Sequence, residues 1–145
     1  MKRLAPILLA LASTLAARAE EEEIDPAVVA AFDEIASAWR AGDARAVGAW
    51  IDKDSKVSLS LDRSGSYSKD QAISLLKDYF EANDVVSLKL EKDGMKGGSS
   101  PSATWDYVTT DADGRKVSAR LFVSLVRRKD RWVLSRVAIY PARDR

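Results

Sequence analysis

The chain has 145 residues, with 23 lysines and arginines against 22 aspartates and glutamates, and it contains neither histidine nor cysteine. The protein therefore cannot carry a Ser-His-Asp triad, a cysteine nucleophile, a disulfide, an iron–sulfur cluster, a His-ligated haem or a zinc site with nitrogen or sulfur ligands. It also lacks the glycine-rich motifs that bind dinucleotides or phosphates, so no cofactor is expected. Acid–base chemistry near neutral pH would depend on Asp, Glu, Tyr or Lys side chains.

The N-terminal segment has the three parts of a secretory signal peptide. Lys2 and Arg3 form the positive start, an apolar run covers 4–15, and Ala-Arg-Ala at 17–19 supplies the small residues of a cleavage site. We expect cleavage after residue 19 and export to the periplasm or the medium, because the apolar run is too short to anchor the chain in a membrane. Cleavage would remove three of the 23 basic residues and none of the 22 acidic ones. The resulting net charge near −2 argues against a nucleic-acid partner.

Residues 20–25 form a short acidic segment, and residues 26–142 are expected to form a single domain, since a chain of this size normally folds around one core. Asp25-Pro26 predicts the start of a helix, and apolar residues three and four positions apart continue it to a C-cap at Gly42. Asp43 predicts the cap of a second, shorter helix.

The next segments predict one strand and one helix before the chain changes to strands only. Apolar residues alternate with serines over 57–61, and a turn is expected at 62–65. Ser68 and Gln71 form a capping-box pattern that leads into a helix with Tyr79 and Phe80 facing inward. This helix is expected to stop near Asn83.

Four further strands are expected at about 86–91, 102–110, 116–127 and 131–140. A loop is expected at 93–101, and turns at 112–114 and near Lys129. Helices followed by an antiparallel meander predict an α+β domain, in which the N-terminal helices pack on one face of a curved antiparallel sheet.

The turn at 111–114, Asp-Ala-Asp-Gly, resembles the start of a calcium loop but lacks its later ligands, and Asp-Gly is common hairpin chemistry. No metal site is therefore expected. A three-residue turn at 112–114 places Asp106 directly opposite Arg120 on the neighbouring strand. The pair is either an ion pair on a solvated face or a charged pair at the back of a cavity, where it would orient an anionic or polar ligand.

Whether Trp132 and Arg136 share the face of Arg120 stays open, because a change of one residue in the turn near Lys129 would reverse it. Five residues of the third helix and the last three strands are the candidate ligand-binding residues. They are Asp106, Arg120, Tyr79, Trp105 and Arg136.

The order of elements resembles the nuclear transport factor 2-like (cystatin-like, cone-shaped) superfamily, and within it an exported bacterial family of unknown function. The likeness lies in Ala41-Gly42-Asp43, in Gly-Ser-Tyr-Ser-Lys-Asp-Gln-Ala at 65–72 leading to Tyr79-Phe80, in Lys96-Gly97-Gly98 and in the closing hairpin at 120–139. The resemblance implies a cavity between helices and sheet, and frequent dimerisation through the sheet. Relatives include ketosteroid isomerases and polyketide cyclases, but also many modules without chemistry.

Two classes of function follow from these observations. The favoured one is an exported, non-enzymatic, homodimeric module that uses its cavity or its sheet face to bind a small ligand or a protein partner. The alternative is a small-molecule isomerase or cyclase that uses Asp106 as a base, with Tyr79 as its partner. Tyr107 is the weaker partner, since neighbouring residues of a strand point to opposite faces. The sequence does not separate an accessory role in an envelope complex from the first class.

Overall fold

A computed structural model describes residues 23–142 of the chain. Its helices are α2 (Pro26–Arg40), α3 (Ala44–Gly48) and α4 (Lys69–Ala82). Its strands are β1 (Val57–Ser60), β2 (Ser64–Tyr67), β3 (Asp84–Lys96), β4 (Ser102–Thr110), β5 (Lys116–Arg128) and β6 (Arg131–Pro141). The expected signal peptide at 1–19 and the first part of the acidic segment lie outside the described residues. Within 23–142, no helix is long and apolar enough to cross a membrane.

Each helix begins directly after a residue whose side chain caps it. The Asp25 carboxylate accepts a hydrogen bond from the backbone N–H of Ala27 at 2.9 Å, and Asp43 accepts one from Ala46 at 3.0 Å. Ser68 and Gln71 form the reciprocal capping box at the start of α4. The expected helix starts are therefore confirmed.

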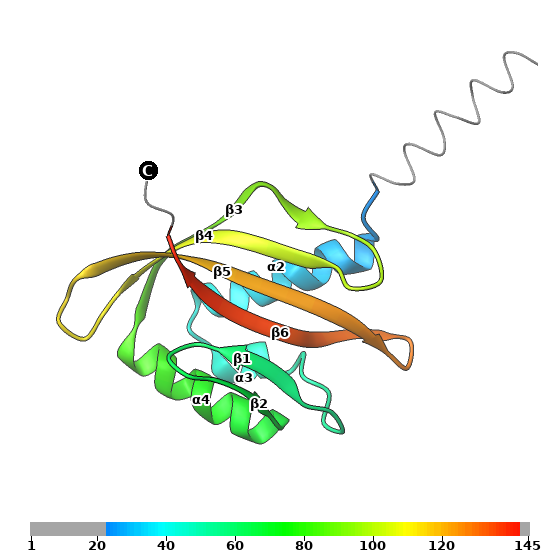
Figure 1. Cartoon of the computed structure of the whole chain (residues 1–145), viewed down its shortest axis with the longest axis horizontal. Helices are drawn as coiled ribbons and strands as arrows, with labels where there is room; N and C mark the ends of the chain where they lie inside the picture. The colour runs from blue at the N-terminus through cyan, green and yellow to red at the C-terminus, as the bar shows by residue number, and fades with distance from the viewer. Residues whose placement is uncertain (1–22, 143–145) are drawn as a thin grey trace, which may run out of the picture.

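The six strands form one sheet in the order β2-β1-β6-β5-β4-β3, and Figure 1 shows its long strands curving over α2 while α4 lies beside β1 and β2. The α+β fold class is thus confirmed. One pairing differs from a simple meander, because β1 runs parallel to β6, with Ser58 beside Arg136 and Ser60 beside Ala138. The sheet is therefore mixed.

Strand β2 was not expected from the sequence, which predicted only a turn before α4. Its residues pair antiparallel with β1, from Val57 opposite Tyr67 to Ser60 opposite Ser64. Ser-Gly-Ser-Tyr has no alternation of apolar residues, because β2 is an edge strand whose side chains are largely exposed. The backbone pairing with β1 forms it instead.

Strand β3 is longer than expected and continues through the first part of the predicted loop at 93–101. Its pairing with β4 shifts register between Leu90 and Met95, where Asp93 has a φ of 57°. A side chain at Gly94 would meet the carbonyl oxygen of Thr104 at 2.7 Å, so glycine is needed for β3 to return to β4 after this bulge.

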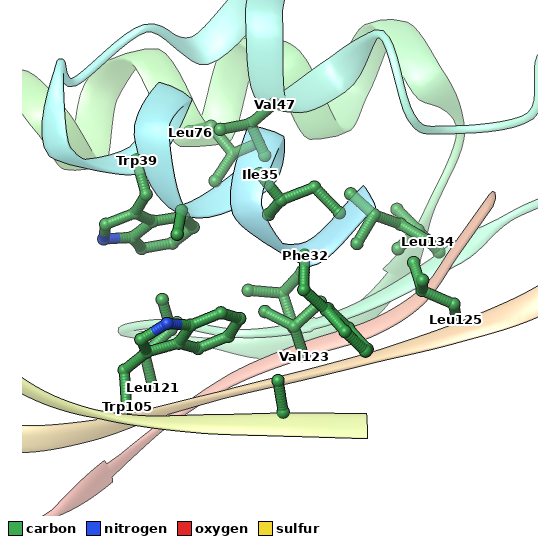
Figure 2. Packing of buried hydrophobic residues seen from close by; sticks show 14 of the residues in the cluster. Phe32, Ile35, Trp39, Val47, Leu76, Trp105, Leu121, Val123, Leu125 and Leu134 are labelled. Carbon is green, nitrogen blue, oxygen red and sulfur yellow. The ribbon is translucent and has the colours of Figure 1, made fainter. Parts of the chain in front are cut away.

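The core lies between α2, α4 and one face of the sheet. Figure 2 shows Phe32, Ile35 and Trp39 of α2 directed toward Trp105 of β4 and the apolar side chains of β5. Alternate residues of β4 and β5 are fully or almost fully buried on this inner face, and the residues between them point to the outer face. This alternation decides which of the candidate residues can reach the interior.

Candidate functional site

The most buried polar contact in the described chain joins two tyrosines from different elements. The hydroxyls of Tyr79 on α4 and Tyr107 on β4 lie 2.9 Å apart and share a hydrogen bond. Tyr79 faces inward because it follows Ala72 and Leu76 on the apolar stripe of α4, and Tyr107 is on the inner face of β4. The pair therefore places two hydroxyls among apolar side chains.

Aromatic rings surround this pair. Trp39 lies 6.0 Å from Tyr79 and 6.0 Å from Tyr107 between ring centroids, and it meets Phe80 edge to face at 4.9 Å. The Nε1–H of Trp39 is buried and makes no hydrogen bond within the usual limits among the described residues. These rings pack around the hydroxyl pair on the α2 side.

A cavity beside the tyrosine pair has two parts. Its larger part, about 310 Å³, lies between the β1–β2 hairpin and α4, and a smaller part of about 150 Å³ continues toward β4, β5 and β6. Leu61, Asp62 and Tyr79 line both parts, so the two parts adjoin each other. The larger part is lined by Leu59, Leu61, Asp62, Arg63, Tyr67, Leu75, Asp78 and Tyr79. Tyr107, Thr109 and Asn83 line the smaller part.

Both phenols are held in the neutral form. Burial raises the pKa of Tyr79 well above its usual range, and the hydrogen bond with Tyr107 and the charge of Asp62 act in the same direction. Burial also raises the pKa of Tyr107, an effect that its hydrogen bond with the Tyr79 hydroxyl partly offsets. The pair can therefore donate and accept hydrogen bonds, but it supplies no phenolate near neutral pH.

The five candidate residues divide between the two faces of the sheet. Tyr79 belongs to the cavity, whereas Trp105 is a core residue that meets Phe32 edge to face with 6.0 Å between ring centroids. Asp106, Arg120 and Arg136 lie on the outer face, away from the cavity. An acid–base role of Asp106 beside Tyr79 is thus ruled out by geometry, since an exposed outer side chain has no access to the buried hydroxyls.

The expected register of the β4–β5 hairpin is confirmed, but the ion pair is not the expected one. Asp106 lies directly opposite Arg120, and the backbone N–H of Asp111 donates to the carbonyl oxygen of Arg115 at 2.9 Å. Arg120 instead forms a bidentate pair with Glu91 of β3, at 2.6 and 3.0 Å. Lys89 is the neighbour of Asp106 on β3, and Glu91, two residues further along β3, lies on the same face within reach of the long guanidinium.

Trp132 and Arg136 lie on opposite faces, which answers the question that the sequence left open. A register shift follows Ser124 of β5, so that Ser124 pairs with Arg136 and Leu125 with Leu134. The extra residue on β6 reverses the alternation there. Trp132 therefore packs against the core, while Arg136 is exposed and donates to the Tyr140 hydroxyl at 2.7 Å.

Sequence reasoning missed the contribution of Leu61 and Asp62 to the cavity, and it ranked Tyr107 as the weaker candidate. The useful signal was the alternation along β4, which places Tyr107 on the face opposite Asp106 and therefore inside. Within residues 23–142, no group of three or more acidic side chains lies close enough together to hold a metal ion.

The sequence matches a known protein family over most of its length. The model of the domain of unknown function DUF4783 matches residues 32–139, which is well over half of the sequence. The chain belongs to the DUF4783 family. A solved DUF4783 protein from Bacteroides uniformis has 14% identity and a TM-score of 0.61, over 77% of this chain and 97% of that one. No curated protein matches the chain.

Two solved structures outside the DUF4783 family show the wider fold. One is named for nuclear transport factor 2 and has 15% identity and a TM-score of 0.58, over 74% of this chain and 90% of that one. The other, from Pseudomonas putida, is described as a candidate polyketide cyclase and has 13% identity and a TM-score of 0.55, over 77% and 88% of the two chains. At these identities the similarity shows the fold alone: this DUF4783 protein has the nuclear transport factor 2-like fold.

Proposed function

We propose that this DUF4783 protein binds a small, largely apolar molecule carrying a hydrogen-bond acceptor, in the cavity between the β1–β2 hairpin and α4. The observation that carries the proposal is the Tyr79–Tyr107 hydroxyl pair, which lines a cavity whose other lining residues are mainly apolar and include the charged Asp62, Arg63 and Asp78. Pockets of this kind, apolar with a few convergent polar groups, are typical of small-molecule sites.

The number of hydroxyl protons in the tyrosine pair indicates that the ligand carries a hydrogen-bond acceptor. Two neutral hydroxyls hold two protons, and the hydrogen bond between them uses one, whichever tyrosine donates. The second proton is left to donate to a group in the cavity. Since a buried donor without a partner costs about 1–3 kcal/mol, a carbonyl or hydroxyl oxygen of a ligand would be a favourable partner.

Binding is favoured over isomerase or cyclase chemistry because of where the carboxylates lie. Such chemistry needs a base beside the substrate, and the base is normally a carboxylate in an apolar environment. Asp62 and Asp78 are the carboxylates that line the larger part of the cavity, and both side chains are exposed at its rim. Neither carboxylate lies in apolar surroundings beside the buried hydroxyls.

A second candidate function, association through the outer face of the sheet, rests on a different set of residues. Arg120 is fixed by Glu91, and Arg136 lies 6.0 Å from the Phe122 ring while it holds Tyr140. Arginine and aromatic side chains are enriched in protein interfaces. A second copy of the chain would be the simplest partner for this face.

Native mass spectrometry of the protein, purified from an exporting host without refolding, tests these proposals together. We expect a mass that corresponds to a chain beginning at Glu20, plus an added mass that is lost on denaturation. The added mass would come from a retained ligand, and a doubled mass would support the second candidate. A full-length chain would contradict export, and a processed monomer without any added mass would contradict both binding proposals.

Removing both hydroxyls should weaken the binding of a carbonyl-bearing probe. The affinity of Tyr79→Phe/Tyr107→Phe for 2-acetylnaphthalene is expected to fall about 2- to 10-fold, because the lost hydrogen bond contributes about 0.5–1.5 kcal/mol. The fold should survive, since replacing both partners with apolar groups of the same shape is close to neutral. Binding is measured by NMR titration, with the backbone amides of Leu61 and Tyr79 as reporters.

A control variant and a control probe test whether the effect comes from the hydroxyl pair. Tyr67→Phe removes a phenol from the same cavity but away from the pair, and it should leave the affinity unchanged. The probe 2-ethylnaphthalene has the same shape without the carbonyl, and the double variant should bind it as well as the unaltered protein does. Equal binding of the two probes to the unaltered protein would show that the hydroxyl pair does not select the ligand.

A further inference from the structure

A second cleft lies at the other end of β1 and is lined mainly by cations. It has a volume of about 360 Å³ and is formed by the loop before β1, the start of α4 and the β5–β6 hairpin, which Figure 1 shows near one another at one end of the molecule. Its lining comprises five cations and two carboxylates: Lys53, Lys69, Arg128, Lys129, Arg131, Asp52 and Asp54. It shares no lining residue with the tyrosine cavity.

The five cations of this cleft outnumber the two carboxylates that line it, and none of them forms an ion pair within 4.0 Å with another described residue. Among residues 23–142 the ion pair within 4.0 Å joins Arg120 and Glu91, which lie elsewhere on the sheet. One of the two carboxylates in the cleft, that of Asp52, accepts a hydrogen bond from the Ser55 hydroxyl at 2.8 Å. The cleft therefore keeps an excess of positive charge.

The β5–β6 hairpin holds two of these cations directly opposite each other. Arg128 pairs with Arg131 across the end of the hairpin, and the two residues between them, Lys129 and Asp130, form its turn with φ values of 47° and 58°. Like charges at directly opposite positions of two strands repel each other. An anion between the guanidinium groups would turn this repulsion into attraction.

The start of α4 adds a second, independent source of positive potential. Lys69, the first residue of this 14-residue helix, lines the cleft. The N-terminus of a helix carries roughly half a positive charge and attracts anions, and in α4 the first-turn carboxylate of Asp70 offsets part of this potential. The backbone of α4 and the side chains of the hairpin therefore favour the same kind of ligand.

We propose that this cleft is a binding site for a phosphate-bearing polyanion, either a soluble oligophosphate or the phosphate of an anionic lipid headgroup. Two arginines can bind phosphate oxygens in a bidentate way, and three lysines add point charges around them. A ligand with more than one negative charge matches the excess of five cations over two carboxylates.

Isothermal titration calorimetry with sodium pyrophosphate, in low-salt buffer, tests the site. The unaltered protein is expected to bind one pyrophosphate saturably, and Arg128→Gln/Arg131→Gln should weaken binding at least tenfold because it removes both bidentate partners. The matched control is Arg115→Gln/Lys116→Gln, which removes the same charge at the opposite end of β5 and should bind as the unaltered protein does. Lys53→Gln/Lys129→Gln tests the cleft a second time without altering strand-paired residues.

Vesicles separate the two sources of phosphate. If the ligand is a lipid headgroup, the unaltered protein should float together with phosphatidylcholine vesicles that contain phosphatidylglycerol. The cleft variants should then remain at the bottom of the gradient. Binding of pyrophosphate without binding of vesicles identifies a soluble ligand. The proposal is overturned if the protein binds neither probe, or if the cleft variants and the control variant bind equally.

Discussion

Replacing Trp39 with alanine is expected to lower the free energy of unfolding by about 3–5 kcal/mol, which is a large part of the stability of a small domain. Trp39 is fully buried, and its ring meets Tyr79, Phe80 and Tyr107. Removing it leaves a cavity behind the hydroxyl pair that the neighbouring rings cannot refill. Urea unfolding, followed by far-ultraviolet circular dichroism, measures the loss.

Trp50 provides the matched control for Trp39. It is only half-buried at the edge of the same core, so Trp50→Ala makes the same chemical change with less lost packing. Its backbone carbonyl still accepts the hydrogen bond from Leu134, which does not depend on the side chain. Equal losses for the two variants would show that Trp39 is not the centre of the core.

Gly48→Ala is expected to destabilise the protein by about 1–3 kcal/mol, although alanine is normally about 0.5–1 kcal/mol better than glycine in a helix. A methyl group at Gly48 would overlap the Ile73 side chain, with Cδ1 at 2.7 Å and Cγ1 closer still. The overlap lies where α3 packs on α4, so steric cost outweighs helix propensity. The loss is again measured by urea unfolding.

A smaller residue at position 73 should relieve this overlap. We expect the double variant Gly48→Ala/Ile73→Ala to lose less stability than the sum of the two single variants, since the two side chains are in contact. Gly97→Ala is the control, because its new methyl group would have ordinary contacts of 3.6 Å or more. Simple additivity at positions 48 and 73 would show that the backbone of α3 shifts to make room.

The parts of the fold that depend on local chemistry followed from the sequence. Asp25, Asp43 and Ser68 each cap the helix that they were expected to cap, because capping needs only a side chain and the next few backbone groups. The β4–β5 register followed from the turn at 112–114 alone, since the alternation of strand residues carries that register to Asp106 and Arg120.

The parts that depend on distant residues did not follow from the sequence. The side chain that pairs with Arg120 belongs to β3, two strands away along the chain, and the bulge in β6 decides that Trp132 turns inward. Neither feature has a signature in hydrophobic periodicity. The same holds for the cavity, because its walls come from β1, β2, α4 and the last three strands, and their distances depend on the packing of all of them.

The parallel pairing of β1 with β6 has a consequence for how the protein folds. Ser58 and its neighbour Arg136 lie far apart in the sequence, so this contact closes a long loop and carries an entropic cost. On a ribosome, β1 and α4 would emerge long before their place in the sheet exists, because β6 is synthesised last. The wall that β1 contributes to the tyrosine cavity is therefore complete only when the whole domain is.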